Sequence, residues 1–238
     1  MNHFKWLLVL PLLATPIGAQ SYYRLRLDDP KAVYLTPENF PVHADGITDD
    51  TEALQSAINK VQETTGEGIV FVPSGRYRLT TTVYAWGGIR MIGFGPTRPV
   101  LVLGENTPGY TNKTQEKYMV FFSGNRLGTG AAGAPAAASN VNPEGGRPAA
   151  PRDANAGTFY SAMSNVDIEI GDGNAGAVGV RGRYAQHSFL AHINFHIGSG
   201  LSGVHDTGNV MEDVHFYGGD YGIWTQTPSP SWQFTAVD

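Results

Sequence analysis

The most constraining feature of the chain is an acidic turn that leads into a short amphipathic segment. Residues 45–50 read DGITDD, and the segment that follows, about 51–61, places Leu54, Ile58 and Val61 at helical spacing. Such a stripe predicts a short helix with one apolar face. Asp49 is a plausible N-cap, with Glu52 three residues later as in a capping box, so we interpret Asp49 and Asp50 as structural.

Short apolar segments follow this helix in quick succession. We expect strands at 69–72, 77–83, 89–92, 100–103 and 118–122, and an edge strand at 22–27. The first of these, IVFV, is apolar throughout, as is typical of a strand buried on both faces. Residues 128–157 contain mostly Gly, Ala, Pro, Ser and Asn, and we expect a flexible insertion there because this composition cannot build a core.

A repeat appears in the last third of the chain. Residues 164–170, 191–197, 211–216 and 235–238 align, and their anchors Val166, Ile193, Val214 and Val237 are 27, 21 and 23 residues apart. A second strand recurs at 177–180, 202–205 and 221–224. Irregular periods of this size with short alternating strands indicate a solenoid, whose open end a helix can cover.

Alternation along the repeat strands separates inner from outer side chains. We expect the following to point inward: Val166, Ile168, Ile170, Ile193, Phe195 and Ile197. We expect these to point outward: Asp167, Glu169, His192, Asn194, His196, Asp213 and His215.

Charge and the N-terminus restrict the partners and the compartment. The formal net charge is −5 without a basic block, which disfavours nucleic-acid binding, and the chain has no cysteine. Residues 1–20 combine Lys5, an apolar run at 6–13 and a small-residue end, which predicts a signal peptide cleaved near Ala19 or Gln20 and a secreted or periplasmic protein. The run is too short to span a membrane, and the alternative is a buried N-terminal helix.

Two groups of motifs resemble known families. Residues 45–51 (DGITDDT) with 70–77 (VFVPSGRY) resemble the pectate-lyase-like β-helix domain of several carbohydrate-active families. Residues 158–160 (TFY), 165–168 (NVDI), 179–180 (GV), 185–186 (AQ) and 213–222 (DVHFYGGDYG) resemble the first β-helix of glycoside hydrolase family 55, which are exo-β-1,3-glucanases with two β-helices. The resemblance implies an all-β, right-handed parallel β-helix, a single-stranded solenoid with an N-terminal cap helix, over residues 21–238.

The chain departs from that family in two respects. The second β-helix, which carries the proposed general acid of the family, has no counterpart here, and the sequence stops within a repeat strand at Val237 and Asp238. We therefore expect a C-terminally incomplete chain, a second β-helix in the same protein as its partner, and a polysaccharide substrate. A polysaccharide lyase on uronic-acid polymers and a non-catalytic glycan-binding module are the alternatives.

Candidate site residues follow from the chemistry of glycoside cleavage. An inverting hydrolase needs two carboxyl groups about 6.5–9.5 Å apart, and outward residues on neighbouring rungs can meet that distance. The candidates are Asp167, Glu169 and Asp213, for which a solvated polar face is the simpler interpretation. Tyr217, Tyr221, Trp224 and also Trp232 are candidates to stack on sugar rings, with core or turn packing as the alternative.

We expect no cofactor and no metal site. His187, His192, His196, His205 and His215 lie close in sequence, but on strands they are poorly spaced to chelate a metal. The lyase alternative alone requires calcium, together with an arginine base. The repeat scheme places Arg181 and Arg183 near Asp167 and Glu169, so that chemistry stays open.

Overall fold

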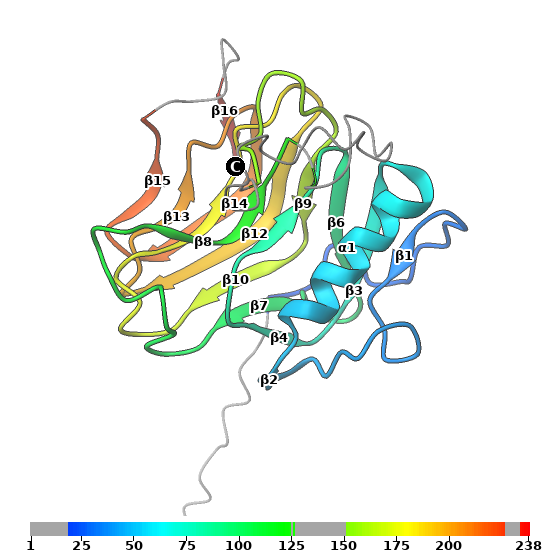
Figure 1. The fold of residues 1–238 in the computed structure, drawn as a ribbon, viewed down its shortest axis with the longest axis horizontal. Coiled ribbons are helices and arrows are strands. Elements are labelled where there is room, and N and C mark those ends of the chain that lie inside the picture. The colour runs from blue at the N-terminus through cyan, green and yellow to red at the C-terminus, as the bar shows by residue number, and fades with distance from the viewer. Residues whose placement is uncertain (1–18, 125, 127–150, 227–233) are drawn as a thin grey trace, which may run out of the picture.

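The computed structural model describes residues 19–124, 126, 151–226 and 234–238. In these residues the chain forms one helix, α1 (Thr51–Thr65), and otherwise strands that pair in parallel. The strands stack in chain order from the α1 end to the opposite end (Figure 1). The predicted all-β parallel β-helix with a cap helix is confirmed.

Each coil of the solenoid passes through three faces. The first face contains β1 (Val33–Tyr34), β3 (Gly68–Pro73), β6 (Ile89–Phe94), β9 (Ala162–Ser164) and β16 (Thr235–Val237). The second face contains β2 (Asp45–Asp49), β4 (Arg76–Leu79), β7 (Val100–Leu103) and β10 (Asp167–Ile170). The third face contains β5 (Val83–Ala85), β8 (Lys117–Phe122), β11 (Ala177–Arg181), β13 (Ser202–His205) and β15 (Tyr221–Trp224).

Two long strands turn the corner between the first and second faces. β12 (Phe189–Gly198) pairs with β9 through its first residues and with β10 through its last, and β14 (Val210–Gly218) pairs along β12. At the corner the backbone adopts a left-handed conformation in three successive coils, at Asn165 (φ 57°), His192 (φ 56°) and Asp213 (φ 50°). One left-handed residue bends a strand sharply, so this column fixes the corner.

The inward-facing residues of the repeat form the core as expected. Val166, Ile168, Ile170, Ile193, Phe195 and Ile197 are all buried. The pairs Ile168↔Phe195 and Ile193↔Val214 confirm the first two repeat alignments. The last alignment is wrong by two residues, because Val237 pairs with Glu212 and not with Val214.

The cap helix differs in detail from the prediction. It extends to Thr65 and buries Leu54, Ile58 and Val61 as expected. The N-cap is Asp50 and not Asp49, and its side chain makes no capping hydrogen bond, so the capping box is wrong.

Both aspartates form hydrogen bonds to neighbouring segments. The buried carboxylate of Asp50 accepts hydrogen bonds from the backbone N–H groups of His43 (2.7 Å) and Ala44 (2.9 Å). Asp49 accepts from the Thr51 N–H and from the Thr80 hydroxyl. Both carboxylates therefore hold the turn before α1 against neighbouring segments.

Two strand predictions are wrong. Residues 22–27 form no strand, and the carbonyl of Tyr23 instead accepts a hydrogen bond from Gly95 N–H. The segment 77–83 is interrupted between β4 and β5, where Thr80 N–H donates to the hydroxyl of Thr51. In both places a side-chain or loop contact replaces ladder pairing.

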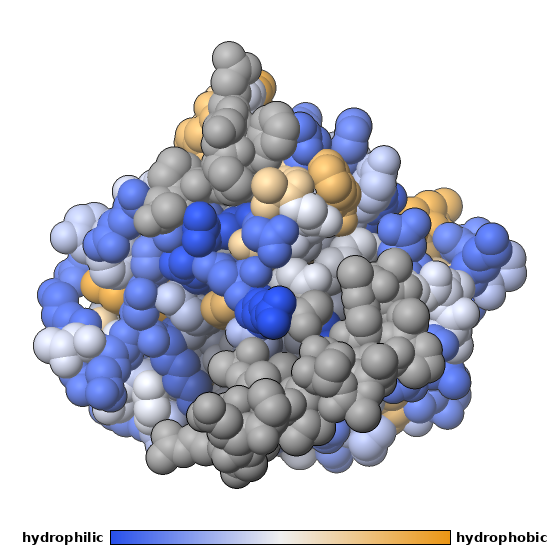
Figure 2. Space-filling model, turned by 45° about the horizontal axis from the view of Figure 1, so that its top comes forward, coloured by the Kyte–Doolittle hydropathy of each residue, from blue (hydrophilic) through white to orange (hydrophobic). Residues whose placement is uncertain are grey.

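The two ends of the described solenoid differ. The α1 end is covered, whereas Val210, Ile223 and Val237 at the other end are 40–54% exposed. On the face shown in Figure 2, exposed hydrophobic residues form small groups among hydrophilic ones. The predicted signal peptide up to residue 18, residues 128–150 of the predicted insertion, and Trp232 lie outside the described residues.

Candidate functional site

The third face gathers charged side chains on neighbouring coils. Phe121, Arg181, His205 and Trp224 pair in one column across β8, β11, β13 and β15. We call the set Glu116, Asp153, Arg181, His205 and Asp206 the third-face cluster. It combines three carboxylates with a guanidinium and an imidazole.

Arg181 is the centre of the cluster. Its Nη2 lies 2.7 Å from Asp153 Oδ2, and its Nη1 lies 3.1 Å from Asp206 Oδ2. Burial favours the neutral guanidine, but the hydrogen bond and charge of Asp153 outweigh it and raise the pKa of Arg181. The side chain is therefore a fixed, permanent cation beneath the surface of the third face.

His205 is buried between the same groups. Its Nδ1 lies 2.5 Å from Glu116 Oε2 and 3.2 Å from Arg181 Nη1. A guanidinium only donates, and one ring nitrogen cannot accept from it while donating to a carboxylate. Nδ1 therefore serves either Arg181 or the carboxylate of Glu116, and not both at once. Nε2 of His205 is buried and has no hydrogen-bond partner in the part of the chain that the structure describes.

An aromatic platform covers the imidazole. Trp224 stacks on His205 with ring centroids 4.5 Å apart and an interplanar angle of 4°, and Tyr221 stacks beside Trp224 at 5.7 Å. Tyr118 lies on the other side of the cluster, where burial, and to a smaller degree the charge of Glu116, raises the pKa of its phenol. Aromatic faces of this kind suit the apolar faces of sugar rings.

Accessibility separates the supporting groups from those that can meet a ligand. The side chains of Arg181 (12%), His205 (4%) and Asp206 (4%) are almost covered. Those of Glu116 (32%) and Asp153 (27%) are partly exposed. The cluster therefore offers two partly exposed carboxylate side chains on a buried ionic support, in which Oδ1 of Asp153 is itself buried.

Sequence reasoning found only part of this site. Tyr221 and Trp224 were candidates, whereas Glu116, Asp153 and Asp206 were missed and His205 was considered only as a metal ligand. The repeat alignment could have placed Arg181 below His205, because their strands are aligned. The prediction that Arg181 and Arg183 lie near Asp167 and Glu169 is wrong, because β10 and β11 belong to different faces.

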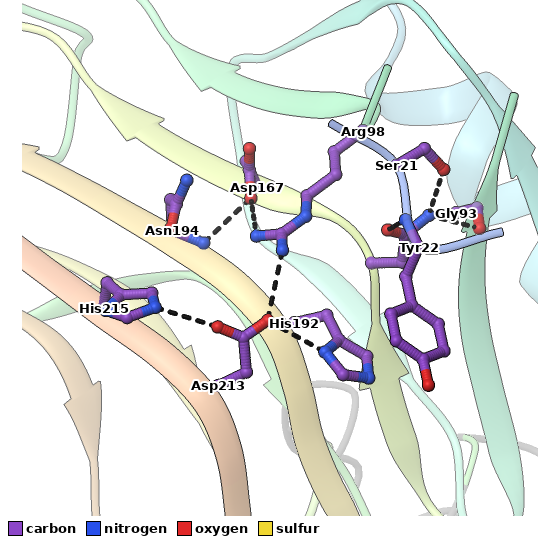
Figure 3. A network of polar contacts seen from close by, with 10 residues as sticks. Ser21, Tyr22, Gly93, Arg98, Asp167, His192, Asn194, Asp213 and His215 are labelled. Carbon is purple, nitrogen blue, oxygen red and sulfur yellow. Dashed lines mark hydrogen bonds and ion pairs between the residues drawn. The ribbon is translucent and has the colours of Figure 1, made fainter. Parts of the chain in front are cut away.

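The predicted carboxylates Asp167 and Asp213 meet at the corner of the first and second faces. Arg98 binds both, with Nη1 3.4 Å from Asp167 Oδ1 and Nη2 3.2 Å from Asp213 Oδ2 (Figure 3). Asp167 also accepts from Asn194 N–H at 2.8 Å. Asp167 is not the solvated outward residue that alternation indicated: it is 4% exposed, because Arg98 and the adjacent coil enclose it.

Asp213 has a different environment from Asp167. It accepts from His192 Nδ1 at 2.9 Å and from His215 Nε2 at 2.8 Å. Burial raises the pKa of Asp167, whereas at Asp213 the histidine hydrogen bonds outweigh burial and lower the pKa. The partners of Asp167 and Asp213 within the described protein are enough to explain both residues as structural, because they hold the corner together.

The remaining candidates lie apart from both groups. Glu169 forms an ion pair with Arg76 at 2.7 Å on the second face. Tyr217 stacks on His196 at 4.9 Å, on the same face. Glu169 and Tyr217 therefore lie on a different face from Tyr221 and Trp224.

Among the described residues, no group of three His, Asp or Glu side chains is arranged to hold a metal ion. Among the same residues, α1 is neither long nor apolar enough to cross a bilayer.

Comparison with known proteins gives one family. A family model described as rhamnogalacturonase A/epimerase, pectate lyase-like, matches residues 38–237. No curated protein matches the chain.

Several solved structures are similar. One is ORF18 of Geobacillus virus E2, with 17% identity over 77% of this chain and 31% of that chain, and a TM-score of 0.43. A second is the catalytic unit of a GH87 α-1,3-glucanase from Streptomyces thermodiastaticus, with 14% identity over 88% and 35% and a TM-score of 0.43. A third is the A-module of the mannuronan C-5 epimerase AlgE4 of Azotobacter vinelandii, with 19% identity over 81% and 53% and a TM-score of 0.41. The chain thus spans between 31% and 53% of these proteins, and the similarity is too low to argue function.

Proposed function

Because the chain belongs to the rhamnogalacturonase A/epimerase, pectate lyase-like family, we propose that it is a carbohydrate-active protein whose third-face cluster binds and cleaves a polysaccharide. One observation carries this proposal: two partly exposed carboxylates, Glu116 and Asp153, flank a buried Arg181–His205 pair under the stacked ring of Trp224. Fold membership alone would not support a reaction.

The chemistry we propose is hydrolysis of a glycosidic bond. Glu116 contacts His205 at 2.5 Å and is partly exposed, and we assign it the role of protonating the leaving oxygen. Asp153 is bound by Arg181 (2.7 Å) and Arg183 (3.7 Å) and is suited to activate water. Together they supply the acid and the base that the reaction needs.

The substrate and the setting of the enzyme are further parts of the proposal. On the family 55 resemblance, β-1,3-glucan is the first substrate to test, and a second β-helix of the same protein would form the other wall of the cleft. A secreted or periplasmic location follows from the predicted signal peptide at 1–20.

A second candidate function is a lyase on uronic-acid polymers. The observation that favours it is the pair of guanidinium groups, Arg181 and Arg183, at one carboxylate, because such a pair also suits the carboxylate of a uronate. This reaction would need calcium as an added cofactor and would leave an unsaturated product.

One assay separates the candidates. The chain and any longer form of the protein are incubated with β-1,3-glucan and with polygalacturonate, with and without a calcium chelator. New reducing ends without ultraviolet-absorbing products support hydrolysis. Absorbing products that disappear with the chelator support the lyase. Saturable binding without any turnover supports a non-catalytic glycan-binding module instead.

A further inference from the structure

A groove of about 770 Å³ lies on the first face, away from the third-face cluster. It runs over β9, β12 and β14, and we call it the first-face groove. Its lining includes Tyr22, Tyr160, His187, Phe189, His192 and Glu212. The proposed cleavage site uses none of these residues.

Stacked rings form both edges of the groove. At one edge Tyr160 stacks on His187, with centroids 5.2 Å apart and planes 15° apart. At the other edge Tyr22 stacks on His192, with centroids 4.0 Å apart and planes 9° apart. The three residues of β9 between the edges span roughly 10 Å. The two stacked pairs therefore lie near opposite ends of β9 along the groove.

The backbone at both edges is in an uncommon conformation. Tyr160 (φ 58°), His187 (φ 61°) and His192 (φ 56°) are all left-handed, although none is glycine. Left-handed backbone at such residues has a free-energy cost and is concentrated at functional positions. At His192 the same conformation also belongs to the column that fixes the corner.

The second edge is also held in place by polar contacts. Tyr22 N–H donates to Asn165 Oδ1 at 2.7 Å, and the amide of Asn165 donates to the Ser21 hydroxyl and to the Gly93 carbonyl, each at 2.8 Å (Figure 3). Asp213 fixes the imidazole of His192 at 2.9 Å. The wall is thus formed before any ligand arrives.

Two polar side chains of the groove lack a side-chain partner among the described residues. Ser164 is 2% exposed, lies in the lining, and its hydroxyl has no hydrogen-bond partner among the described residues. A buried hydroxyl without a partner is unfavourable unless a ligand or water completes it. Glu212, on the rim, has no ion pair in that part of the chain.

We propose that the first-face groove binds a segment of a neutral glycan, independently of the cleavage site. The stacked rings receive the apolar faces of the sugars, while the hydroxyl of Ser164 and the carboxylate of Glu212 bind sugar hydroxyl groups. The carboxylate of Glu212 would repel a uronate. The lining also contains the cation Arg90, whose Nε donates to the Tyr160 carbonyl at 3.1 Å and whose guanidinium lies over the Tyr160 ring, 5.6 Å from its centroid.

The test first weakens sugar binding on the third face and then changes the first-face groove, one residue at a time. The full chain carrying Trp224→Ala, which weakens sugar stacking on the third face, is titrated by calorimetry with laminarihexaose, cellohexaose and mannohexaose, and with an oligogalacturonate. Tyr160→Asn and Ser164→Ala are then added separately. Asn tolerates the left-handed backbone at position 160, so the ring is lost with little added strain. Circular dichroism and thermal unfolding verify that each variant is folded.

The proposal expects a neutral hexasaccharide to bind the Trp224→Ala protein, at least tenfold weaker binding after Tyr160→Asn, and severalfold weaker binding after Ser164→Ala. It is overturned if no neutral sugar binds, if both added substitutions leave affinity unchanged, or if the oligogalacturonate binds more tightly. Binding that Tyr160→Asn and Ser164→Ala weaken, in a protein that cleaves no glycan, would support this groove even if the proposed cleavage fails.

Discussion

Trp224 lies flat on His205, one coil below it in the solenoid, with ring centroids 4.5 Å apart and planes 4° apart. His205 in turn contacts Glu116 and Arg181. The stack therefore joins the aromatic surface of the third face to its charged groups.

Replacing Trp224 should weaken substrate binding more than turnover. Aromatic stacking contributes about 1 kcal/mol beyond area burial, so Trp224→Ala should raise KM for a cleaved glycan roughly fivefold. Trp224→Phe retains a smaller ring, so its KM should lie between the values of the wild type and of Trp224→Ala. Steady-state kinetics of the three proteins give the order. Equal KM values in all three would remove Trp224 from the binding surface.

Replacing the two reachable carboxylates should abolish most of the activity. Because one is proposed to donate a proton and the other to activate water, Glu116→Gln and Asp153→Asn should each lower kcat by about 10²–10⁴-fold. Asp28→Asn is a matched control, since Asp28 is an exposed carboxylate whose side chain contacts Arg26 at 3.8 Å. Activity of both site variants within threefold of the control would refute the assignment.

The fold was predictable because its signals are local and repeated. The alternation that buries Val166, Ile193 and Phe195 recurs in each coil, so one pattern is read several times. The alignment of Val237 was wrong because β16 has only three paired residues. The described residues contain no further strand of the same coil against which the register could be checked. The edge strand at 22–27 was wrong because alternation does not report whether a partner strand is available.

The site was less predictable because its members come from separate segments. Asp153 reaches Arg181 from a loop 28 residues earlier, next to a segment whose composition predicts an insertion. Its place on the third face depends on how that loop closes, for example through the hydrogen bond from Ala154 N–H to the Phe122 carbonyl. Such closure leaves no periodic trace in the sequence.

The corner aspartates should impose opposite pH slopes on stability. Burial raises the folded pKa of Asp167 above its ordinary value of 3.8. Its contribution to stability is therefore complete at low pH and is lost as the pH rises through the folded pKa. Relative to the wild type, Asp167→Asn should become more stable as the pH rises from 3 to 7. Urea unfolding across that range measures the slope.

Asp213 should behave in the opposite way. Burial acts to raise its pKa, but the hydrogen bonds from His192 and His215 prevail and lower it below 3.8. Its contribution is present above that value and is lost as the pH falls through the folded pKa. Asp213→Asn should thus be less stable than the wild type at pH 7 and similar to it at acid pH. Parallel slopes for the two variants would contradict the separate environments.

Gly93 packs against Asn165 at the corner and should not tolerate a side chain. A Cβ at this position of β6 would lie 1.9 Å from the carbonyl oxygen of Asn165 and 2.7 Å from Pro99 Cδ, and neither group can move without shifting the backbone. Gly93→Ala should therefore lower the free energy of unfolding by about 3 kcal/mol, at the upper end of overpacking effects. Gly87→Ala is the control, because the nearest atoms to its added Cβ are 3.6 Å away, and it should change stability by less than about 0.5 kcal/mol. Equilibrium urea unfolding of both variants decides the matter. Equal free energies of unfolding for Gly93→Ala and Gly87→Ala would mean that Gly93 does not pack closely against Asn165.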